Sequence, residues 1–264
     1  MRVNIGTVVM NTLRPLYGER EARNIAKYLI PEFVLLDEVQ LKNALERLSQ
    51  QEPWQYVIGK EWFYDLEFKV TPDTLIPRPE TEELVHLILN DNKESALHLL
   101  DIGTGTGCIP IVLKKNKPQW LVTACDISEK ALDIARENAQ TNNVEIELER
   151  IDILNQHPKR SDWDIIVSNP PYIPLKEKEL MSNNVLHYEP HLALFVEDDD
   201  PLLFYEKIGN YAFNHLSKSG KLYFELNEFY SQEISTLLKN IGFDKVKVVH
   251  DLMDKPRMIM AKLH

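Results

Sequence analysis

The second half of the chain alternates between short apolar runs and segments in which apolar residues recur at helical spacing. Runs such as ALHLLDIG and WDIIVS have the length of buried strands, and amphipathic segments separate them. This alternation after residue 95 is typical of an α/β fold with a mainly parallel sheet. We expect strands at ALHLLDIG, WLVTACDI, IELERIDI, WDIIVS and GKLYFELN, and an antiparallel hairpin in FDKVKVVHDLMDKPRMIMAKLH.

Helices are expected between these strands. CIPIVLKKN follows the first strand, and SEKALDIARENAQTNN, which Ser128 can cap, follows the second. PLLFYEKIGNYAFNHL predicts a later helix that ends near Gly220. The acidic run 197–200 before it is expected to be a solvated loop.

The first part of the chain has a different pattern. From Val8 to about Gln51 apolar residues recur at helical spacing, as in EARNIAKYLI and VQLKNALERL. EWFYDLEFKV predicts a hairpin, and a further helix is expected to begin near Pro79. We expect the short helices to be separated by Pro15, Pro31 and Pro53. The predicted organisation is a helical domain over residues 1–59, a linking β-hairpin over 60–77 and an α/β domain over 78–264.

The composition of the chain excludes several classes of function. With 264 residues, the chain can form one large domain or a catalytic domain with an appendage. Its net charge of −11 disfavours a general binder of nucleic-acid backbones. Two cysteines provide neither a disulfide framework nor a metal-ligand cluster, so we expect no metal and a reducing compartment, the cytoplasm. No apolar run approaches the roughly 18 residues of a membrane span, so no membrane association is expected.

A glycine-rich turn joins the first strand to its helix in LLDIGTGTGCIP. In an open α/β sheet a ligand binds at such a turn, although a tight turn alone is the alternative. The dinucleotide fingerprint requires glycine where this chain has Cys108. The carboxylate of Asp101 would repel a pyrophosphate and attract a cation. The sulfonium and amino groups of S-adenosylmethionine fit this charge, with Gly103, Gly105 and Gly107 forming the turn.

Two further carboxylates follow the next two strands. Asp126 lies about twenty residues beyond the glycines, where a carboxylate can accept hydrogen bonds from both ribose hydroxyls. The alternative is that it merely begins the next helix alongside Ser128. Asp152, after the following strand, could lie near the adenine. The candidate cofactor-binding residues are Asp101, Gly103, Thr104, Gly105, Thr106, Gly107, Asp126, Asp152, Ile153 and Asn169.

The strand WDIIVS is followed by NPPYIP. Proline fixes φ, has no N–H and holds the preceding residue extended, so this strand exit is rigid. It offers mainly acceptors, namely the side-chain oxygen of Asn169 and the carbonyls of Asn169 and Pro170. A ligand group that donates hydrogen bonds is expected there. The alternative is a rigid strand end with a packed aromatic ring.

DIGTGTG together with NPPY resembles the class I S-adenosylmethionine-dependent methyltransferases that act on a nitrogen of a planar, conjugated group. More of the chain resembles one family among them, the peptide chain release factor glutamine methyltransferases of the HemK/PrmC type. The similarity runs from about Gln51 to Leu194. It rests on EPWQYVIG, LEFKVTPDTLIPRPETEELV, DIGTGTGCI, NPPYIP and YEPHLAL.

The resemblance implies a Rossmann-like, seven-stranded methyltransferase sheet and a helical N-terminal domain that recognises the substrate. It also implies methyl transfer to the side-chain nitrogen (N5) of the glutamine in the Gly-Gly-Gln loop of class 1 peptide chain release factors, without direct nucleic-acid binding. Asn169, Pro170 and Tyr172 would be catalytic and, with Pro171, would bind the substrate. The chain departs from the family at FVEDDDPLL and FELN, which lack the usual glycines.

Two other functions share some of these features. An adenine-N6 DNA or RNA methyltransferase would use the same motif on a flipped base, but the acidic balance disfavours it. A non-enzymatic cofactor-binding protein would have no need of NPPY. We expect His187 and His191 to be structural or exposed, and Arg78 and Glu80 to serve either the site or an ion pair.

Overall fold

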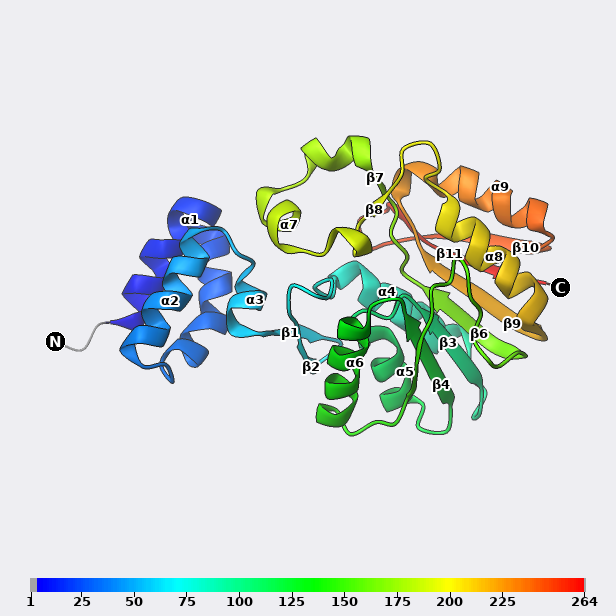
Figure 1. Cartoon of the computed structure of the whole chain (residues 1–264), viewed down its shortest axis with the longest axis horizontal. Coiled ribbons are helices and arrows are strands. Elements are labelled where there is room, and N and C mark those ends of the chain that lie inside the picture. Colours follow the sequence, from blue (N-terminus) through cyan, green and yellow to red (C-terminus); the bar gives the residue numbers. More distant parts are fainter. Residues whose placement is uncertain (1–3, 264) are drawn as a thin grey trace.

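The computed structural model describes residues 4–263, which form a helical part and a larger α/β body joined by a hairpin (Figure 1). The helical part contains α1 (Ile5–Phe33), α2 (Glu38–Ser49) and α3 (Trp54–Ile58). Asp37 begins α2 with a capping box, because its carboxylate accepts a hydrogen bond from the Gln40 N–H. The three helices enclose a core of their own, which includes Val9, Leu13, Ile25, Leu29, Phe33 and Leu48.

The expectation that prolines separate the N-terminal helices was wrong for two of the three. Pro15 and Pro31 lie inside α1, and the helix breaks at Gly18, where φ is 74° and ψ is 174°. The φ of proline is close to the helical value, so a helix can continue through it at a cost in stability, whereas a φ of 74° leaves the helix and favours glycine. Pro53 does precede α3, as predicted.

The hairpin was predicted correctly. Strands β1 (Lys60–Phe63) and β2 (Leu66–Lys69) pair antiparallel, and the two turn residues Tyr64 and Asp65 have φ values of 51° and 61°. Such values are typical of two-residue hairpin turns. Asn138 attaches the hairpin to the α/β body, because its side chain accepts from Lys69 N at 2.7 Å and donates to Lys69 O at 3.0 Å.

The α/β body is built on one seven-stranded sheet in the order β10-β11-β9-β6-β3-β4-β5. The first five strands of the sheet along the chain are parallel, and β11 runs antiparallel to β9 and β10. This confirms the Rossmann-like α/β prediction and the C-terminal hairpin. The strands are β3 (His98–Ile102), β4 (Leu121–Asp126), β5 (Glu147–Arg150), β6 (Trp163–Ser168), β9 (Leu216–Glu225), β10 (Lys245–His250) and β11 (Pro256–Lys262).

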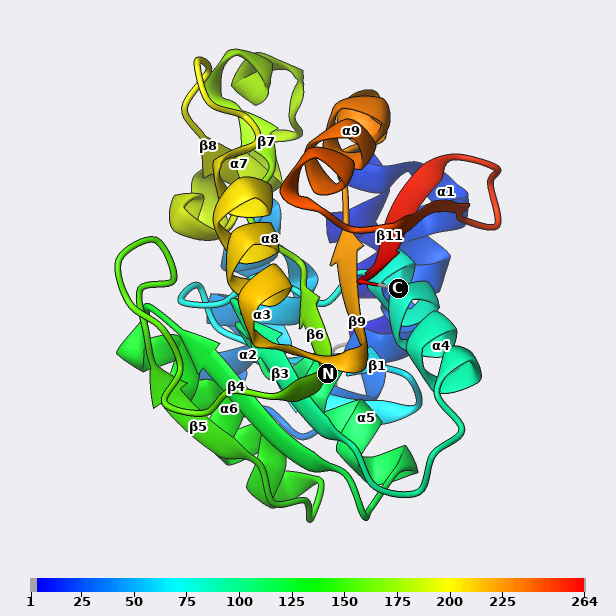
Figure 2. The ribbon, with the colours of Figure 1, turned by 90° about the vertical axis from the view of Figure 1, so that its right-hand side faces the viewer.

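Helices cover both faces of the sheet (Figure 2). On β3, Leu99 packs toward one set of helices and its neighbour Leu100 toward the other, because successive strand residues point to opposite faces. The first set is α4 (Pro79–Asp91), α5 (Cys108–Asn116) and α6 (Glu129–Thr141), and the second is α8 (Leu203–His215) and α9 (Ser231–Ile241).

The predicted end of α8 needs correction. The helix ends at His215 rather than near Gly220, which lies within β9. A Cβ atom at Gly220 would lie 2.8 Å from the Trp163 carbonyl oxygen, so glycine permits the close approach of β6 rather than ending a helix.

A segment of short elements lies between β6 and α8 at the carboxyl edge of the sheet (Figure 1). Within it, the acidic run 197–200 is exposed, as predicted, and the Asp198 carboxylate accepts from Lys176 N at 2.7 Å. Its elements are β7 (Ile173–Pro174), η1 (Leu175–Leu180), α7 (Asn183–Tyr188), η2 (His191–Ala193) and β8 (Phe195–Val196), and η3 (Glu228–Tyr230) follows β9. Over residues 4–263, no helix has the length and apolar character that a membrane crossing requires.

Candidate active site

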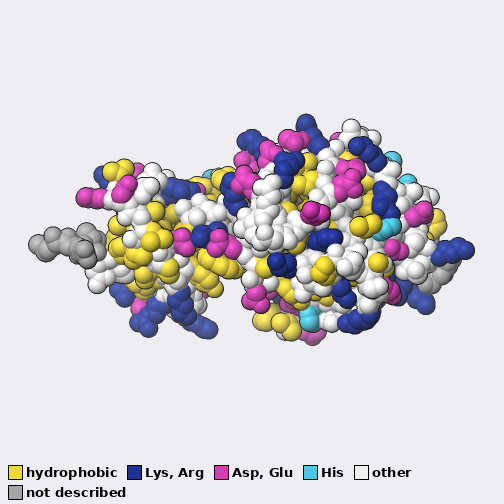
Figure 3. Space-filling view, turned by 90° about the horizontal axis from the view of Figure 1, so that it is seen from below, with side chains coloured by type: hydrophobic (Ala, Val, Ile, Leu, Met, Phe, Trp, Pro, Cys, Tyr) yellow, Lys and Arg dark blue, Asp and Glu magenta, His cyan; other side chains and the backbone are white. Residues whose placement is uncertain are grey.

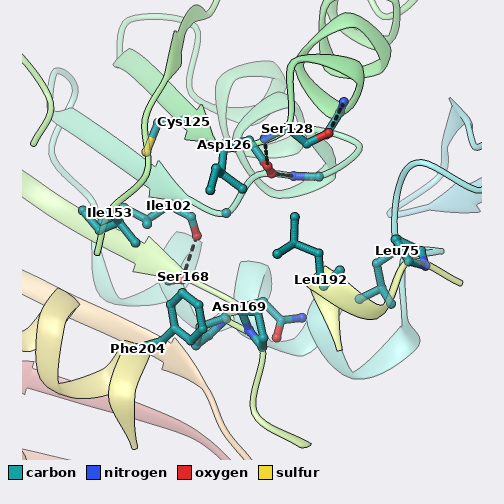
Figure 4. A pocket seen from close by; sticks show the side chains of 18 of the residues that line it. Leu75, Ile102, Cys125, Asp126, Ser128, Ile153, Ser168, Asn169, Leu192 and Phe204 are labelled. Carbon is teal, nitrogen blue, oxygen red and sulfur yellow. Dashed lines mark hydrogen bonds between the residues drawn. The ribbon is translucent and has the colours of Figure 1, made fainter. Parts of the chain in front are cut away.

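A cavity of about 330 Å³ lies at the edge of the sheet where β3, β4, β5 and β6 end. Because these strands are parallel, their carboxyl ends meet at one edge, where open α/β sheets bind ligands. Figure 4 shows Asp126 and Asn169 on opposite sides of this cavity. The predicted cofactor residues on its wall are Gly103, Gly105, Asp126, Asp152, Ile153 and Asn169.

The glycine turn presents its backbone to the cavity. Gly103 and Gly105 have φ values of 76° and 54°, and a Cβ atom added at either would meet no described atom of residues 4–263 within 4 Å. The turn is held in place because the N–H groups of Gly103 and Thr104 donate to the Cys125 carbonyl at 2.9 and 3.0 Å. A ligand can therefore approach the turn backbone closely.

The other predicted residues of the turn support it from behind. Asp101, Thr104 and Thr106 are buried, and none of them lines the cavity. Gly107 also lies off the cavity wall, where an added Cβ would be 3.1 Å from the Ala135 Cβ on α6. These residues shape the turn, and only Gly103 and Gly105 of its predicted residues line the cavity.

Asp101 is an unpaired buried carboxylate beneath the turn. Neither of its oxygens, nor Thr104 Oγ1, has a hydrogen-bond partner among the described residues. Burial raises the pKa of Asp101 to about 7, and the charge of Asp126 adds to the rise, whereas the Thr104 hydroxyl opposes it. A buried carboxylate of this kind favours a cationic or hydrogen-bond-donating ligand nearby.

Asp126 lines the cavity and also holds the turn into the next helix alongside Ser128, the second of the two alternatives for this residue. Its Oδ2 accepts from Gly105 N at 2.9 Å and its Oδ1 accepts from Ser128 N at 2.9 Å, while Ser128 Oγ caps α6 by accepting from Ala131 N. Burial raises the pKa of Asp126, and these N–H donors oppose the rise. The carboxylate therefore braces both turns and keeps acceptor capacity for a ligand in the cavity.

The part of the cavity wall that follows β5 has a polar residue, Asp152, next to an apolar one, Ile153. Asp152 accepts from Leu154 N at 3.1 Å and from Asn155 Nδ2 at 2.7 Å, so its carboxylate organises the turn. Ile153 is buried and faces the cavity together with Ile102 (Figure 4). This part of the cavity suits a flat apolar ring with polar edges.

A second cavity, of about 150 Å³, adjoins the first at the NPPY motif. Asn169 and Pro170 line both cavities, Pro171 lines the first and Tyr172 the second. In the part of the chain that the structure describes, neither Asn169 Oδ1 nor the Pro170 carbonyl accepts a hydrogen bond. Two free acceptors therefore lie where the two cavities meet.

Arg78 lines the second cavity and forms an ion pair with Glu189. Its guanidinium lies 2.5 Å from Glu189, whose side chain is 1% exposed and also accepts from Ile76 N at 3.3 Å. Of the two alternatives for Arg78, the ion pair is present, with Glu189 rather than Glu80 as its partner, and Arg78 also lines the second cavity. This pair joins the IPRPE segment to YEPHLAL.

The two histidines after the motif contact backbone carbonyls. His187 Nδ1 lies 2.8 Å from the Asn183 carbonyl, and His191 Nε2 lies 2.9 Å from the Leu186 carbonyl. Both histidines are exposed, which agrees with the expected structural role. Across residues 4–263, no group of three or more His, Cys, Asp or Glu side chains could hold a metal ion.

Comparison with known proteins identifies the family. Residues 81–188 match the Methyltransferase small domain family. A release factor glutamine methyltransferase of Flavobacterium psychrophilum is 41% identical over 97% of both chains. One of Bacteroides thetaiotaomicron is 45% identical over 84% of this chain and 80% of its own length. The chain belongs to the release factor glutamine methyltransferase family. It is therefore a methyltransferase, as its sequence motifs indicated.

Solved structures support the fold of this methyltransferase. A methyltransferase from Pyrococcus furiosus matches with a TM-score of 0.56 and 20% identity, over 76% of this chain and 90% of that one. The hMettl16 catalytic domain, in complex with MAT2A 3′UTR hairpin 6, matches with a TM-score of 0.61 and 19% identity, over 76% and 77%. At these identities the likeness concerns the fold alone.

Two buried residues beside the second cavity were missed at the sequence level. Glu225, at the end of β9, is buried and lines the second cavity, and its side chain accepts from Thr81 Oγ1 at 2.7 Å and from Tyr172 OH at 3.4 Å. A charged residue within the apolar run KLYFELN was the available signal, because a buried carboxylate is informative. Its partner Thr81 is 144 residues away in sequence, so no local pattern connects them.

Proposed function

We propose that this release factor glutamine methyltransferase transfers a methyl group from S-adenosyl-L-methionine to N5 of the glutamine in the Gly-Gly-Gln loop of class 1 release factors. One observation carries the proposal. In a chain of this family, a large cavity at the glycine turn and a small cavity lined by NPPY share the wall formed by Asn169 and Pro170. The first would hold the cofactor and the second the glutamine side chain.

The residues of the first cavity fit S-adenosylmethionine. Its volume of about 330 Å³ is within the usual range for small-ligand sites. Gly103 and Gly105 leave room beside the turn, Asp126 can accept from ribose hydroxyls, and Ile153 can pack against the adenine. The unpaired charge of Asp101 favours a cationic ligand above the turn. When bound, the cofactor supplies an electrophilic methyl group on a sulfonium.

The second cavity would hold the amide nitrogen of the glutamine. This nitrogen is a weak nucleophile because its lone pair is delocalised into the carbonyl, as in a peptide bond. Asn169 Oδ1 and the Pro170 carbonyl can each accept one of its two hydrogens, which favours pyramidal nitrogen and orients the lone pair. Positioning and charge placement therefore do most of the catalysis.

Tyr172 would bound the glutamine site with its ring. Its hydroxyl donates to Glu225 at 3.4 Å, which fixes the ring, and its backbone carbonyl accepts from Asn227 at 3.3 Å, which fixes the backbone beneath it. Burial raises the pKa of Tyr172, which keeps the phenol protonated. It is therefore a wall against water rather than a base. The methylated amide is acidic, and its proton can leave to water.

We further propose that the helical part, within residues 1–59, recognises the release factor. It exposes the large apolar side chains of Tyr28, Val34, Leu35 and Val39, and Figure 3 shows apolar side chains grouped over this part of the chain. In the proposed domain organisation, residues 60–77 form the linking hairpin and residues 78–264 form the methyltransferase domain. On the face in Figure 3, charges of both signs intermingle over the α/β body, which is unlike a nucleic-acid-binding surface. The reaction would take place in the cytoplasm, where translation ends.

Methyl transfer from labelled S-adenosylmethionine tests this function. The purified chain is incubated with a release factor, with the same factor carrying glutamate in place of the loop glutamine, or with DNA and RNA that contain adenine. We expect label on the unmodified factor alone. Label on nucleic acid would support an adenine-N6 methyltransferase instead, and equal labelling of both factors would exclude the loop glutamine as the acceptor.

A further inference from the structure

A chain of hydrogen bonds connects the NPPY motif to a buried carboxylate. Asn169 Nδ2 donates to Thr81 Oγ1 at 3.4 Å, and Thr81 Oγ1 donates to Glu225 Oε2 at 2.7 Å. Thr81 and Glu225 are only 3% and 2% exposed, so bulk solvent has little access to these contacts. Thr81 lies in the first turn of α4 and Glu225 at the end of β9, and both elements are packed into the core beside the second cavity.

The chemistry of these groups determines which atom donates and which accepts in each hydrogen bond. Both Glu225 oxygens receive hydroxyl donors, from Thr81 and from Tyr172, and an ionised carboxylate can only accept. Burial raises the pKa of Glu225, while the hydrogen bond from Thr81 and the charge of Arg257 oppose the rise. The Thr81 hydroxyl donates its single proton to Glu225 Oε2, which accepts it whether the carboxyl is ionised or carries a proton on Oε1. The Thr81 oxygen can then only accept from Asn169.

Because the Thr81 oxygen can only accept, the NH₂ group and the Oδ1 atom of Asn169 are not interchangeable. Only the NH₂ end can donate to Thr81, so Oδ1 is directed away from it. If the amide rotated by 180°, Oδ1 would face a hydroxyl oxygen with no proton to offer, and the NH₂ group would face the substrate nitrogen. Two donor groups facing each other make no hydrogen bond. A free asparagine has no comparable preference between the two orientations.

We propose that Thr81 and Glu225 are positioning residues that orient Asn169 so that Oδ1 faces the substrate amide. The inference rests on the proposed function, because an acceptor at this position is needed only if the substrate donates from an NH₂ group. Neither residue touches the reacting atoms in this account. They act through Asn169, and their effect belongs to the methyl-transfer step rather than to cofactor binding.

Thr81→Val is the sharpest test, because valine has nearly the shape of threonine and lacks the hydroxyl. Single-turnover methylation of a release factor should slow by about tenfold, the equivalent of one lost hydrogen bond. Thr81→Ser keeps the hydroxyl and should retain the wild-type rate within about twofold. Calorimetry should give the same S-adenosylmethionine affinity for all three proteins, which also verifies that each variant is folded.

The same substitution in an Asn169→Asp background separates positioning from packing. Aspartate presents an acceptor oxygen in either orientation, so Thr81→Val should there slow methylation by less than about twofold. An equal slowing in both backgrounds, a wild-type rate for Thr81→Val, or an inactive Asn169→Asp enzyme would overturn the proposal. A wild-type chain that labels no release factor would instead refute the proposed function, and the inference with it.

Discussion

Asp101 should destabilise the folded protein when no cofactor is bound. Its carboxylate is buried, and neither oxygen has a hydrogen-bond partner in the described part of the chain. The substitution Asp101→Asn removes the charge and keeps the shape. We expect the variant to be more stable than wild type in the absence of S-adenosylmethionine and to bind S-adenosylmethionine more weakly.

The raised pKa of Asp101 gives the size of this destabilisation of the folded protein. A rise from 3.8 in the unfolded chain to about 7 in the folded one corresponds to about 4 kcal/mol against folding above pH 7. An unpaired buried amide costs about 1–3 kcal/mol, so the net gain for the variant is about 1–3 kcal/mol. The folded state holds the proton more tightly, so the penalty is absent below pH 3.8, grows as the pH rises from 3.8 to 7 and is complete above pH 7.

Denaturant unfolding between pH 5 and 8 measures the effect. The stability of wild type should fall with rising pH relative to Asp101→Asn, and the gap should be widest at pH 8. Asp251→Asn is the matched control, because Asp251 accepts from Lys255 N and Arg257, and the Lys255 hydrogen bond lowers its pKa. That variant should be less stable than wild type.

Two results would refute the reasoning about Asp101. If Asp101→Asn is less stable than wild type at pH 8, the carboxylate has a partner in the folded protein. If its S-adenosylmethionine affinity equals that of wild type, the charge does not contribute to the cofactor site. Calorimetric titration at pH 8 gives the second quantity directly.

The remaining predictions concern the cofactor turn and the helical part. Asp126→Ala should weaken S-adenosylmethionine binding by roughly 1.5–3 kcal/mol while leaving the fold intact, and unchanged affinity in calorimetry would remove it from the site. Both Gly103→Ala and Gly107→Ala strain a positive φ, but Gly103→Ala should also weaken cofactor binding, because its Cβ would occupy the open space beside the turn. Gly107→Ala should lower the free energy of unfolding further than Gly103→Ala, by about 1–3 kcal/mol, through its contacts with α5 and α6, and the opposite pattern would contradict this division. A chain beginning at Glu61 should bind cofactor but methylate a full-length release factor slowly, and a full rate would mean that the helices serve another purpose.

The sequence was sufficient for most of the α/β body because local patterns determine it. The apolar runs of β3, β4 and β6, the glycine turn and the Ser128 cap each depend on neighbouring residues, and all were predicted. Errors arose where a residue type has two uses. Pro15 was taken for a helix end although the break occurs three residues later, at Gly18, and Gly220 was taken for a helix end although it permits strand contact.

The site was only partly predictable, for a different reason. The cavity-lining residues Asp126 and Asn169 follow strands, and strand ends are visible in the sequence. Contacts between distant segments are not, so the sequence could not reveal that Glu225 meets Thr81 or that Arg78 pairs with Glu189. The hydrogen-bond direction at NPPY is a property of these long-range contacts.

The rate of methyl transfer by Asn169 variants tests the central claim most directly. Single-turnover methylation of a release factor is measured for wild type, Asn169→Asp and Asn169→Ala, with S-adenosylmethionine affinity measured in parallel. The two-acceptor account predicts that wild type is fastest, aspartate intermediate and alanine slowest, with little change in cofactor affinity, because the acceptor matters most as the nitrogen loses conjugation. An Asn169→Ala enzyme that methylates as fast as wild type would contradict the account and leave Asn169 as a strand terminator.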